Sequence, residues 1–174
     1  MKINLTLLIS FTILFTACEK DTDSESKNYL NASGEMYEIV QGALDIVGGA
    51  SNYDDTILEL RFVSSGIDIT RNESGKQTFS GSGAMIYFST SSLTSELMSF
   101  YSCSKTEHVS IGTFIGSYSL DYDFETETGV VEKITDGSIT VVKGGNEYEI
   151  TFNCTNDKGE NVSGVFSGEL KHFN

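Results

Sequence analysis

The chain has 174 residues and a formal net charge of −14, from 11 Lys and Arg against 25 Asp and Glu. This acidity argues against a nucleic-acid partner and against adsorption to anionic lipid, because both need a surface rich in Lys and Arg. A hydrophobic fraction of 39% is enough for a folded core, and the length favours one domain. With two His and three Cys, we expect no metal or other cofactor and no His-based catalytic triad.

Residues 1–17 have the pattern of an export signal. Lys2 precedes an apolar stretch from Ile3 to Phe15, which as a helix would rise only about 20 Å, short of a bilayer core of roughly 30 Å. The pattern therefore predicts a signal peptide. The run Leu14-Phe15-Thr16-Ala17-Cys18 resembles the lipobox of bacterial lipoproteins, which implies that Cys18 is lipidated and begins the mature chain. A plain secretory signal with a chance cysteine is the alternative.

Residues 18–34 are predicted to be the lipidated cysteine followed by a flexible tether, because residues 19–34 are polar and almost without apolar side chains. Glu19, Lys20 and Asp21 resemble the acidic export signal of Bacteroidota surface lipoproteins. That resemblance implies an outer-membrane location with the domain facing the cell exterior. An ordinary solvated linker is the alternative.

Residues 35–174 are predicted to form one all-β domain, an antiparallel sandwich or a partly closed barrel of about eight or nine strands. Short stretches rich in Ile, Val, Thr, Tyr and Phe alternate with polar residues and are separated by Gly, Asn, Asp and Ser. The candidate strands are Met36–Val47, Thr56–Val63, Ala84–Ser89, Met98–Cys103, Thr113–Phe124, Ser138–Val142, Tyr148–Cys154 and Asn161–Phe173.

Three local patterns refine this prediction. In Met36–Val47 a helix stays possible, although Gly42 weakens it. The turn residues from Thr155 to Glu160 predict a hairpin between the last two strands. Gly164 and Gly168 indicate a bulge or a close backbone approach.

Residues 35–173 as a whole resemble the C-terminal domains of small Bacteroidota lipoproteins. The resemblance rests on Gly81–Phe88, Gly112–Phe114, Asp136–Val141, Tyr148–Phe152, Asp157–Gly159 and Gly164–Leu170. It implies a cell-envelope address and a β fold, and it carries no catalytic motif.

Cys103 and Cys154 are the cysteines left after lipidation. Cys154 is in phase with Ile150 and Phe152, and Cys103 with Tyr101, so both can face the core. One alternative is a disulfide, which the envelope permits and which, closing a loop of about 50 residues, would stabilise by roughly 3–5 kcal/mol. The other is two separately buried thiols.

Other polar and aromatic residues suggest sites, each with a simpler explanation. Asp121, Asp123, Glu125 and Glu127 alternate along an extended segment, which predicts a solvated strand face rather than a calcium loop. Asp55-Thr56-Ile57 resembles the O-glycosylation acceptor of Bacteroidota, with Thr56 as the modified residue. Exposed aromatic rings can form a platform for carbohydrate, and the candidates are Tyr29, Tyr37, Tyr53 and Tyr101. The alternative is that these rings fill the core.

The sequence thus predicts a non-catalytic, surface-exposed envelope lipoprotein that binds a partner. The partner is a glycan, a peptide or an outer-membrane importer of the SusC/SusD type, to which small lipoproteins can be accessory. A fimbria-like structural or adhesive subunit that exchanges strands is the alternative. A glycan hydrolase is the third hypothesis, and among so many acidic residues the sequence nominates no catalytic pair.

Overall fold

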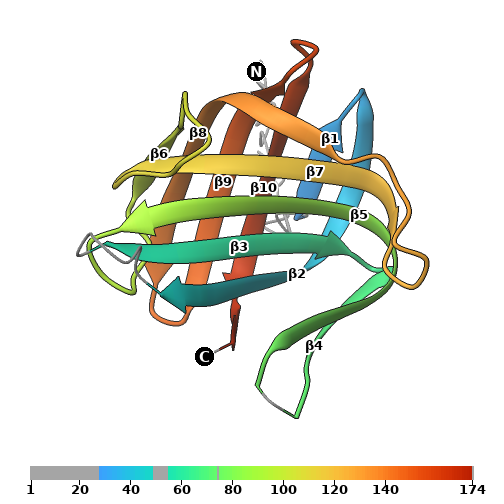
Figure 1. Cartoon of the computed structure of the whole chain (residues 1–174), viewed down its shortest axis with the longest axis horizontal. Helices are drawn as coiled ribbons and strands as arrows, with labels where there is room; N and C mark the ends of the chain where they lie inside the picture. The colour runs from blue at the N-terminus through green and yellow to red at the C-terminus, as the bar shows by residue number, and fades with distance from the viewer. Residues whose placement is uncertain (1–27, 49–54, 74, 174) are drawn as a thin grey trace, which may run out of the picture.

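The computed structural model describes residues 28–48, 55–73 and 75–173, which contain eleven strands in a single sheet and no helix (Figure 1). Accordingly, no helix in this part of the chain is able to cross a bilayer. The strands are β1 (Tyr29–Ala32), β2 (Glu35–Gly48), β3 (Thr56–Ser64), β4 (Ile67–Arg71), β5 (Gln77–Ser92), β6 (Phe100–Cys103), β7 (Thr113–Asp123), β8 (Glu132–Gly144), β9 (Glu147–Asn156), β10 (Asn161–Glu169) and β11 (Lys171–Phe173). The all-β prediction is confirmed, and the segment left open between strand and helix is strand β2.

The sheet follows chain order and rolls up on itself. Antiparallel pairs link β2, β3, β5, β7, β8, β9 and β10 in turn. Strand β1 then pairs with β10 on one side and with β2 on the other, so it joins the two ends of the sheet. Because β1 has only four residues, this closure is partial. Short β6 is paired to β7 and β8, and β11 runs parallel to β2.

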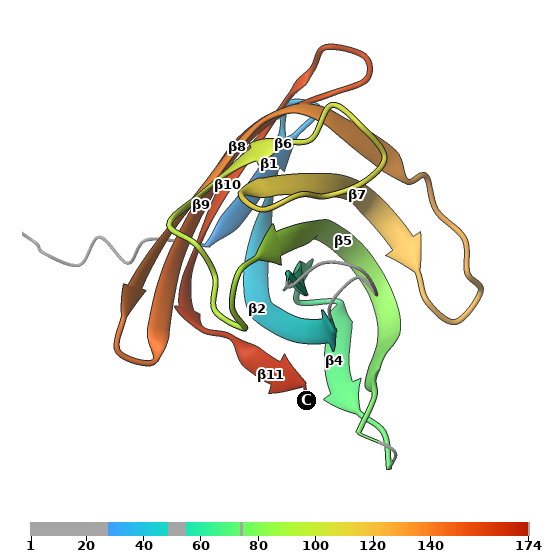
Figure 2. The same cartoon turned by 60° about the vertical axis from the view of Figure 1, so that its left-hand side comes forward.

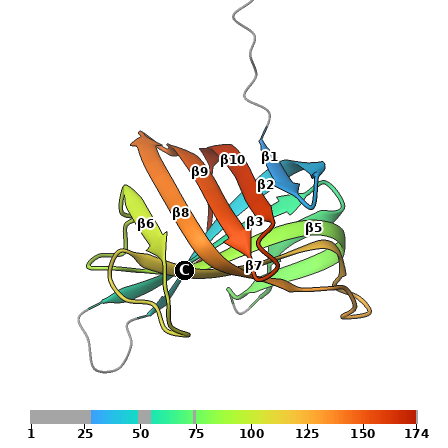
Figure 3. The ribbon, with the colours of Figure 1, turned by 90° about the horizontal axis from the view of Figure 1, so that it is seen from above.

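The rolled sheet has two layers that enclose the core. Figures 1 and 3 show β2, β3, β5 and β7 in one layer, crossed steeply by β8, β9 and β10 in the other. Crossed layers of this kind place the inward side chains of both layers face to face. The architecture is therefore the sandwich-like, partly closed barrel that the strand pattern predicts.

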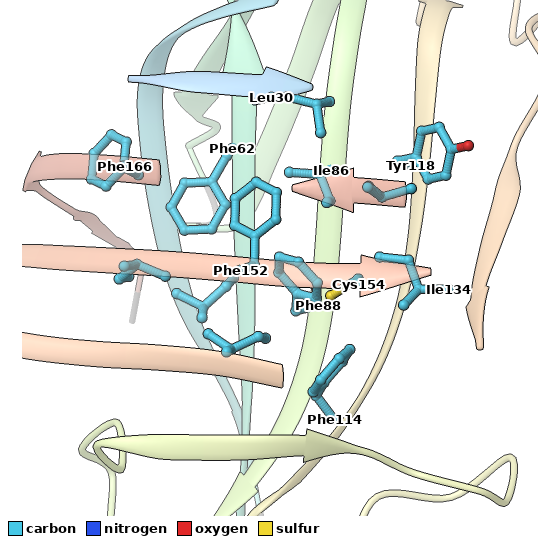
Figure 4. Packing of buried hydrophobic residues seen from close by; sticks show 14 of the residues in the cluster. Leu30, Phe62, Ile86, Phe88, Phe114, Tyr118, Ile134, Phe152, Cys154 and Phe166 are labelled. Atoms are coloured by element: carbon cyan, nitrogen blue, oxygen red, sulfur yellow. The ribbon is translucent and has the colours of Figure 1, made fainter. Parts of the chain in front are cut away.

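Aromatic rings fill the space between the layers. Leu58, Leu60 and Phe62 of β3 share one face, as predicted, and are fully buried. The ring centre of Phe88 lies 5.4 Å from that of Phe152 and 5.4 Å from that of Phe114 (Figure 4). The interior is a packed core, as in other barrels of about eight strands.

The predicted tether is too long, because its last residues form β1. Asn28 immediately precedes this strand: its side-chain amide donates to the Ser167 carbonyl at 3.1 Å and accepts from the Ser167 N–H at 2.7 Å. Its backbone carbonyl accepts from the Ile39 N–H at 2.9 Å. Pairing on both sides makes these four residues a strand, and Leu30 and Ala32 are fully buried in the core. Cys18, the signal peptide and the rest of the tether lie outside the described residues.

A hairpin that the strand pattern did not predict covers part of the outer face (Figure 2). Strand β5 is much longer than predicted, and it bends at Gly81, whose φ is +85° and whose absent Cβ would lie 2.2 Å from the Gly66 carbonyl oxygen. The part of β5 that precedes the bend, from Gln77 to Gly81, pairs with β4. The hairpin buries Ala43 and Val63 beneath Ile67 and Ile69. This small second cluster lies on the opposite face of the sheet from the main core.

Candidate functional site

One end of the rolled sheet, where β2 and β8 begin and β7 ends, has a depression of about 250 Å³. We call this depression the mouth. It is lined by Tyr37 from β2, by Tyr118, Leu120 and Asp121 from β7, and by Val130 and Glu132 from the start of β8 and the residues before it. Three of these side chains are aromatic or aliphatic walls, and Tyr118 and Glu132 supply polar atoms.

The polar floor of the mouth is fixed by a buried amide. Tyr118 is 1% exposed; its hydroxyl donates to Glu132 Oε2 at 2.8 Å and accepts from Asn156 Nδ2 at 3.0 Å. Asn156 Nδ2 also lies 2.9 Å from Glu132 Oε2 and 2.9 Å from Glu160 Oε2. Its Oδ1 accepts the N–H groups of Lys158 and Glu160 at 3.0 and 2.8 Å. One asparagine thus closes the β9–β10 turn and ties that turn to the floor.

The charges at the floor are set by these partners. Lys158 Nζ pairs with Glu132 Oε1. The hydrogen bond from Lys158 has the largest effect and the bond from Tyr118 the next largest, and both hold the pKa of Glu132 below its ordinary value. Burial, and then the bond to Glu132, raises the pKa of Tyr118. At neutral pH the floor therefore presents an ionised carboxylate beside a neutral phenol.

The rim combines apolar surface with further carboxylates. The Tyr37 hydroxyl donates to Glu35 Oε2 at 2.6 Å, which holds the ring at the edge of the mouth. Val130 is 65% exposed, and Asp121 is also exposed. A concave site with apolar walls and a few fixed polar groups is the usual form of a small-ligand site.

The opposite end of β8 carries a second, more polar depression of about 330 Å³, lined by Lys143, Gly145, Asn146, Tyr148, Glu169, Leu170 and His172. Lys143 Nζ lies 5.7 Å from the centre of the Tyr148 ring and 3.5 Å from Glu96 Oε1. The Lys143 and Glu96 side chains are 47% and 74% exposed. We take the mouth as the candidate site, because its polar atoms are held in place by buried hydrogen bonds.

The aromatic and acidic residues that the sequence suggests as sites lie in different parts of the structure. Tyr37 lies in the mouth, Tyr29 is half-buried in β1, and Tyr53 is outside the described residues. Tyr101 is fully buried and accepts a hydrogen bond from the Met98 N–H at 2.7 Å, so it belongs to the core. In the acidic run, Asp123 caps a turn by accepting the N–H of Glu125 at 2.9 Å.

One further predicted site residue, Thr56, is placed by the structure but its modification is not tested. Thr56 begins β3, is half-buried and is paired with Ser92; its glycosylation stays a prediction. Among the residues that the structure describes, no group of three or more His, Cys, Asp or Glu is arranged to hold a metal ion.

Both cysteines are buried, free thiols, so the structure has the second of the two alternatives. Strand β8 lies between them: Ser102 pairs with Ser138, and Gly137 pairs with Cys154. Two strand spacings separate their Cα atoms by roughly 10 Å, beyond the usual reach of a disulfide. Burial raises the pKa of the Cys154 thiol to about 12 and also raises that of Cys103.

No family model, curated protein or solved structure matches the chain. The functional argument therefore rests on the mouth itself. The sequence places Tyr118 in the predicted strand Thr113–Phe124 and Asn156 in a predicted turn, but it does not connect them. It gives no signal for Glu132 or Val130; Glu132 reaches the site because the register of the β7–β8 pair places it opposite Tyr118.

Proposed function

We propose that the chain is a non-catalytic lipoprotein of the cell envelope whose mouth binds a small ligand or a side chain of a larger partner. The observation that carries the proposal is the hydrogen-bonded set of Tyr118, Glu132 and Asn156 beneath a partly apolar rim. Burying polar groups costs free energy, and a fully paired set fixes their positions. Fixed polar groups beside apolar walls are suited to recognition.

The address is part of the same proposal. It is supported by the lipobox-like run ending at Cys18 and by the acidic residues after it. A lipid anchor of more than one acyl chain holds a protein stably at a membrane without a spanning segment. A SusC/SusD-type importer is the proposed larger partner.

The chemistry of the mouth supports binding rather than catalysis. A general acid needs a carboxyl group with a raised pKa, whereas that of Glu132 is lowered. Neither described cysteine is suited to act as a nucleophile, because both thiols are buried and have raised pKa values. The alternative of strand exchange receives no support from β1, which is already paired on both edges.

Protease treatment of intact cells tests the address. We expect external protease to remove the domain of the wild-type protein, and the Cys18→Ala variant to lose its membrane attachment. A domain that stays protected on intact cells would contradict surface exposure.

A pair of matched variants tests the mouth. Val130 and Val142 are both exposed valines, at 65% and 58%; Val130 lies two residues before the start of β8 and Val142 lies near its end. Val130→Lys places a long charged side chain in the mouth, while Val142→Lys places the same group elsewhere. We expect co-isolation of an importer or glycan from native membranes to be lost with Val130→Lys and kept with Val142→Lys. Equal capture by both variants would contradict a role for the mouth.

A further inference from the structure

We propose that the mouth takes an ammonium group on an apolar carbon skeleton, as in a free alkylamine or the lysine side chain of a peptide. This inference rests on the proposed function of the mouth and names its ligand class. It starts from the walls: Tyr37, Leu120 and Val130 bound a depression of about 250 Å³. These side chains offer contact to a short methylene chain, with no charged group of their own.

The second step is the charge around these walls. Asp121 and Glu132 line the mouth, and Glu35 holds its rim through Tyr37. Lys158, the cation beside the floor of the mouth, is already paired with Glu132. The Asp121 carboxylate has no hydrogen-bond or ion-pair partner among the described residues. The mouth therefore has negative charge that is not neutralised locally, and a cation is the ligand that would neutralise it.

The third step is the position of the aromatic ring. Tyr37 and Asp121 border the same depression, and the negative charge of Asp121 acts on the Tyr37 hydroxyl and raises its pKa, after the larger effect of the Glu35 bond. An ammonium group is attracted both by a carboxylate and by the face of an aromatic ring. An anionic ligand would meet only repulsion from Asp121 and Glu132, and the net charge of −14 strengthens this preference at long range.

Calorimetric titration of the detergent-solubilised full chain tests the ligand class. The two cationic probes are pentylamine and N-acetyl-lysine methylamide, which separate a free amine from a peptide side chain. Their neutral counterparts are 1-pentanol and N-acetyl-norleucine methylamide. We expect at least one cationic probe to bind about tenfold more tightly than its counterpart, the factor that about 1.4 kcal/mol of charge interaction gives. Added salt should reduce the difference.

Two carboxylate variants locate the effect. Asp121→Asn should lower the preference for the amine to about twofold or less, because it removes the unpaired carboxylate from the mouth. Asp68→Asn is the matched control: Asp68 is an exposed carboxylate on β4, outside the mouth, and its loss should leave the preference unchanged. Equal losses in both variants would mean that the preference comes from overall charge and would overturn the site.

The outcomes separate this inference from the proposed function. If the amines bind no better than the neutral probes, or do not bind, the ammonium ligand is wrong. If a neutral sugar such as maltose then binds and Val130→Lys abolishes that binding, the mouth keeps its proposed function with a different ligand. If the amines bind equally well to Val130→Lys, the ligand class holds but its assignment to the mouth is overturned.

Discussion

The two ends of the rolled sheet hold similar residue types and use them differently. At the mouth, a tyrosine and a glutamate are joined by the buried Asn156, with every contact between 2.8 and 3.0 Å. At the opposite end, Lys143 sits over the Tyr148 ring and pairs with Glu96 at 3.5 Å, with both charged side chains largely exposed. The mouth is a fixed polar site, while the opposite end is an ordinary charged surface.

The two ends differ because the polar groups of the mouth are buried and those of the opposite end are exposed. Asn156 and Tyr118 are each 1% exposed, so an unmade hydrogen bond there carries the full cost of desolvation. An exposed ion pair loses little when it breaks, because water replaces the partner. Substitutions at the two ends should therefore have very different effects on the free energy of unfolding.

The largest effect is expected for Asn156→Ala. The change removes the acceptor for two backbone N–H groups of the turn and the donor to Tyr118 and Glu132. We expect the free energy of unfolding in urea to fall by roughly 2–4 kcal/mol, from several lost buried hydrogen bonds. Asn153→Ala, at an exposed position of the same strand, is the control and should change it by less than about 0.5 kcal/mol. Similar losses in both variants would remove the distinction between buried and exposed amides.

The next effect is on acid stability. The folded-state pKa of Glu132 is below its ordinary value of 4.5. Its contribution to stability is therefore complete above about pH 4.5 and is lost as pH falls through the lowered pKa. The wild type should be more stable than Glu132→Gln at pH 7, and the gap in melting temperature should close below that window. A gap that stays constant down to pH 2 would show that ionisation of Glu132 does not contribute.

A third prediction concerns the core between the two ends. The pKa of Cys154 is raised to about 12 and that of Cys103 is also raised, so neither thiol should react with Ellman's reagent in the folded protein at pH 8. Both should react when urea unfolds the chain. Intact mass and thiol titration of protein from the envelope should find the two thiols unbonded. A mass lower by two hydrogens would show that oxidation moves β8 aside.

The smallest effect is expected at the opposite end. Lys143→Ala and Glu96→Gln each break the ion pair that joins these two exposed side chains. We expect each to lower the free energy of unfolding by less than about 0.5 kcal/mol. A loss above about 1 kcal/mol in either variant would mean that this end is as rigidly built as the mouth.

Alternation of apolar residues was sufficient to predict most of the fold. The face shared by Leu58, Leu60 and Phe62 identified β3, because side chains of a strand repeat every second residue. The close approach expected at Gly164 is also present: an added Cβ would lie 2.2 Å from the Tyr29 carbonyl oxygen. Strand β1 escaped prediction because one of its two neighbours, β10, is distant in sequence, and the other, β2, follows it after a turn of only two residues, Ser33-Gly34.

The mouth could not be predicted from local sequence patterns, because its residues come from segments that are far apart in the chain. Tyr118 and Asn156 are 38 residues apart, and Asn156 is 24 residues from Glu132. Sequence identified Asn156 as a turn residue and Tyr37 as a candidate aromatic, each correctly placed on its own segment. Their meeting at one end depends on the register of three strand pairs and on the roll of the sheet. No periodicity within one strand contains that information.

The most direct test of the account is to find which end of the barrel a ligand perturbs. Amide chemical shifts of the isotope-labelled full chain in detergent would be followed during titration with N-acetyl-lysine methylamide. The account predicts that the shifts concentrate at Tyr37, Leu120, Asp121 and Val130, the residues of the mouth. Shifts concentrated instead at Lys143, Asn146 and His172 would place binding at the opposite end and contradict it.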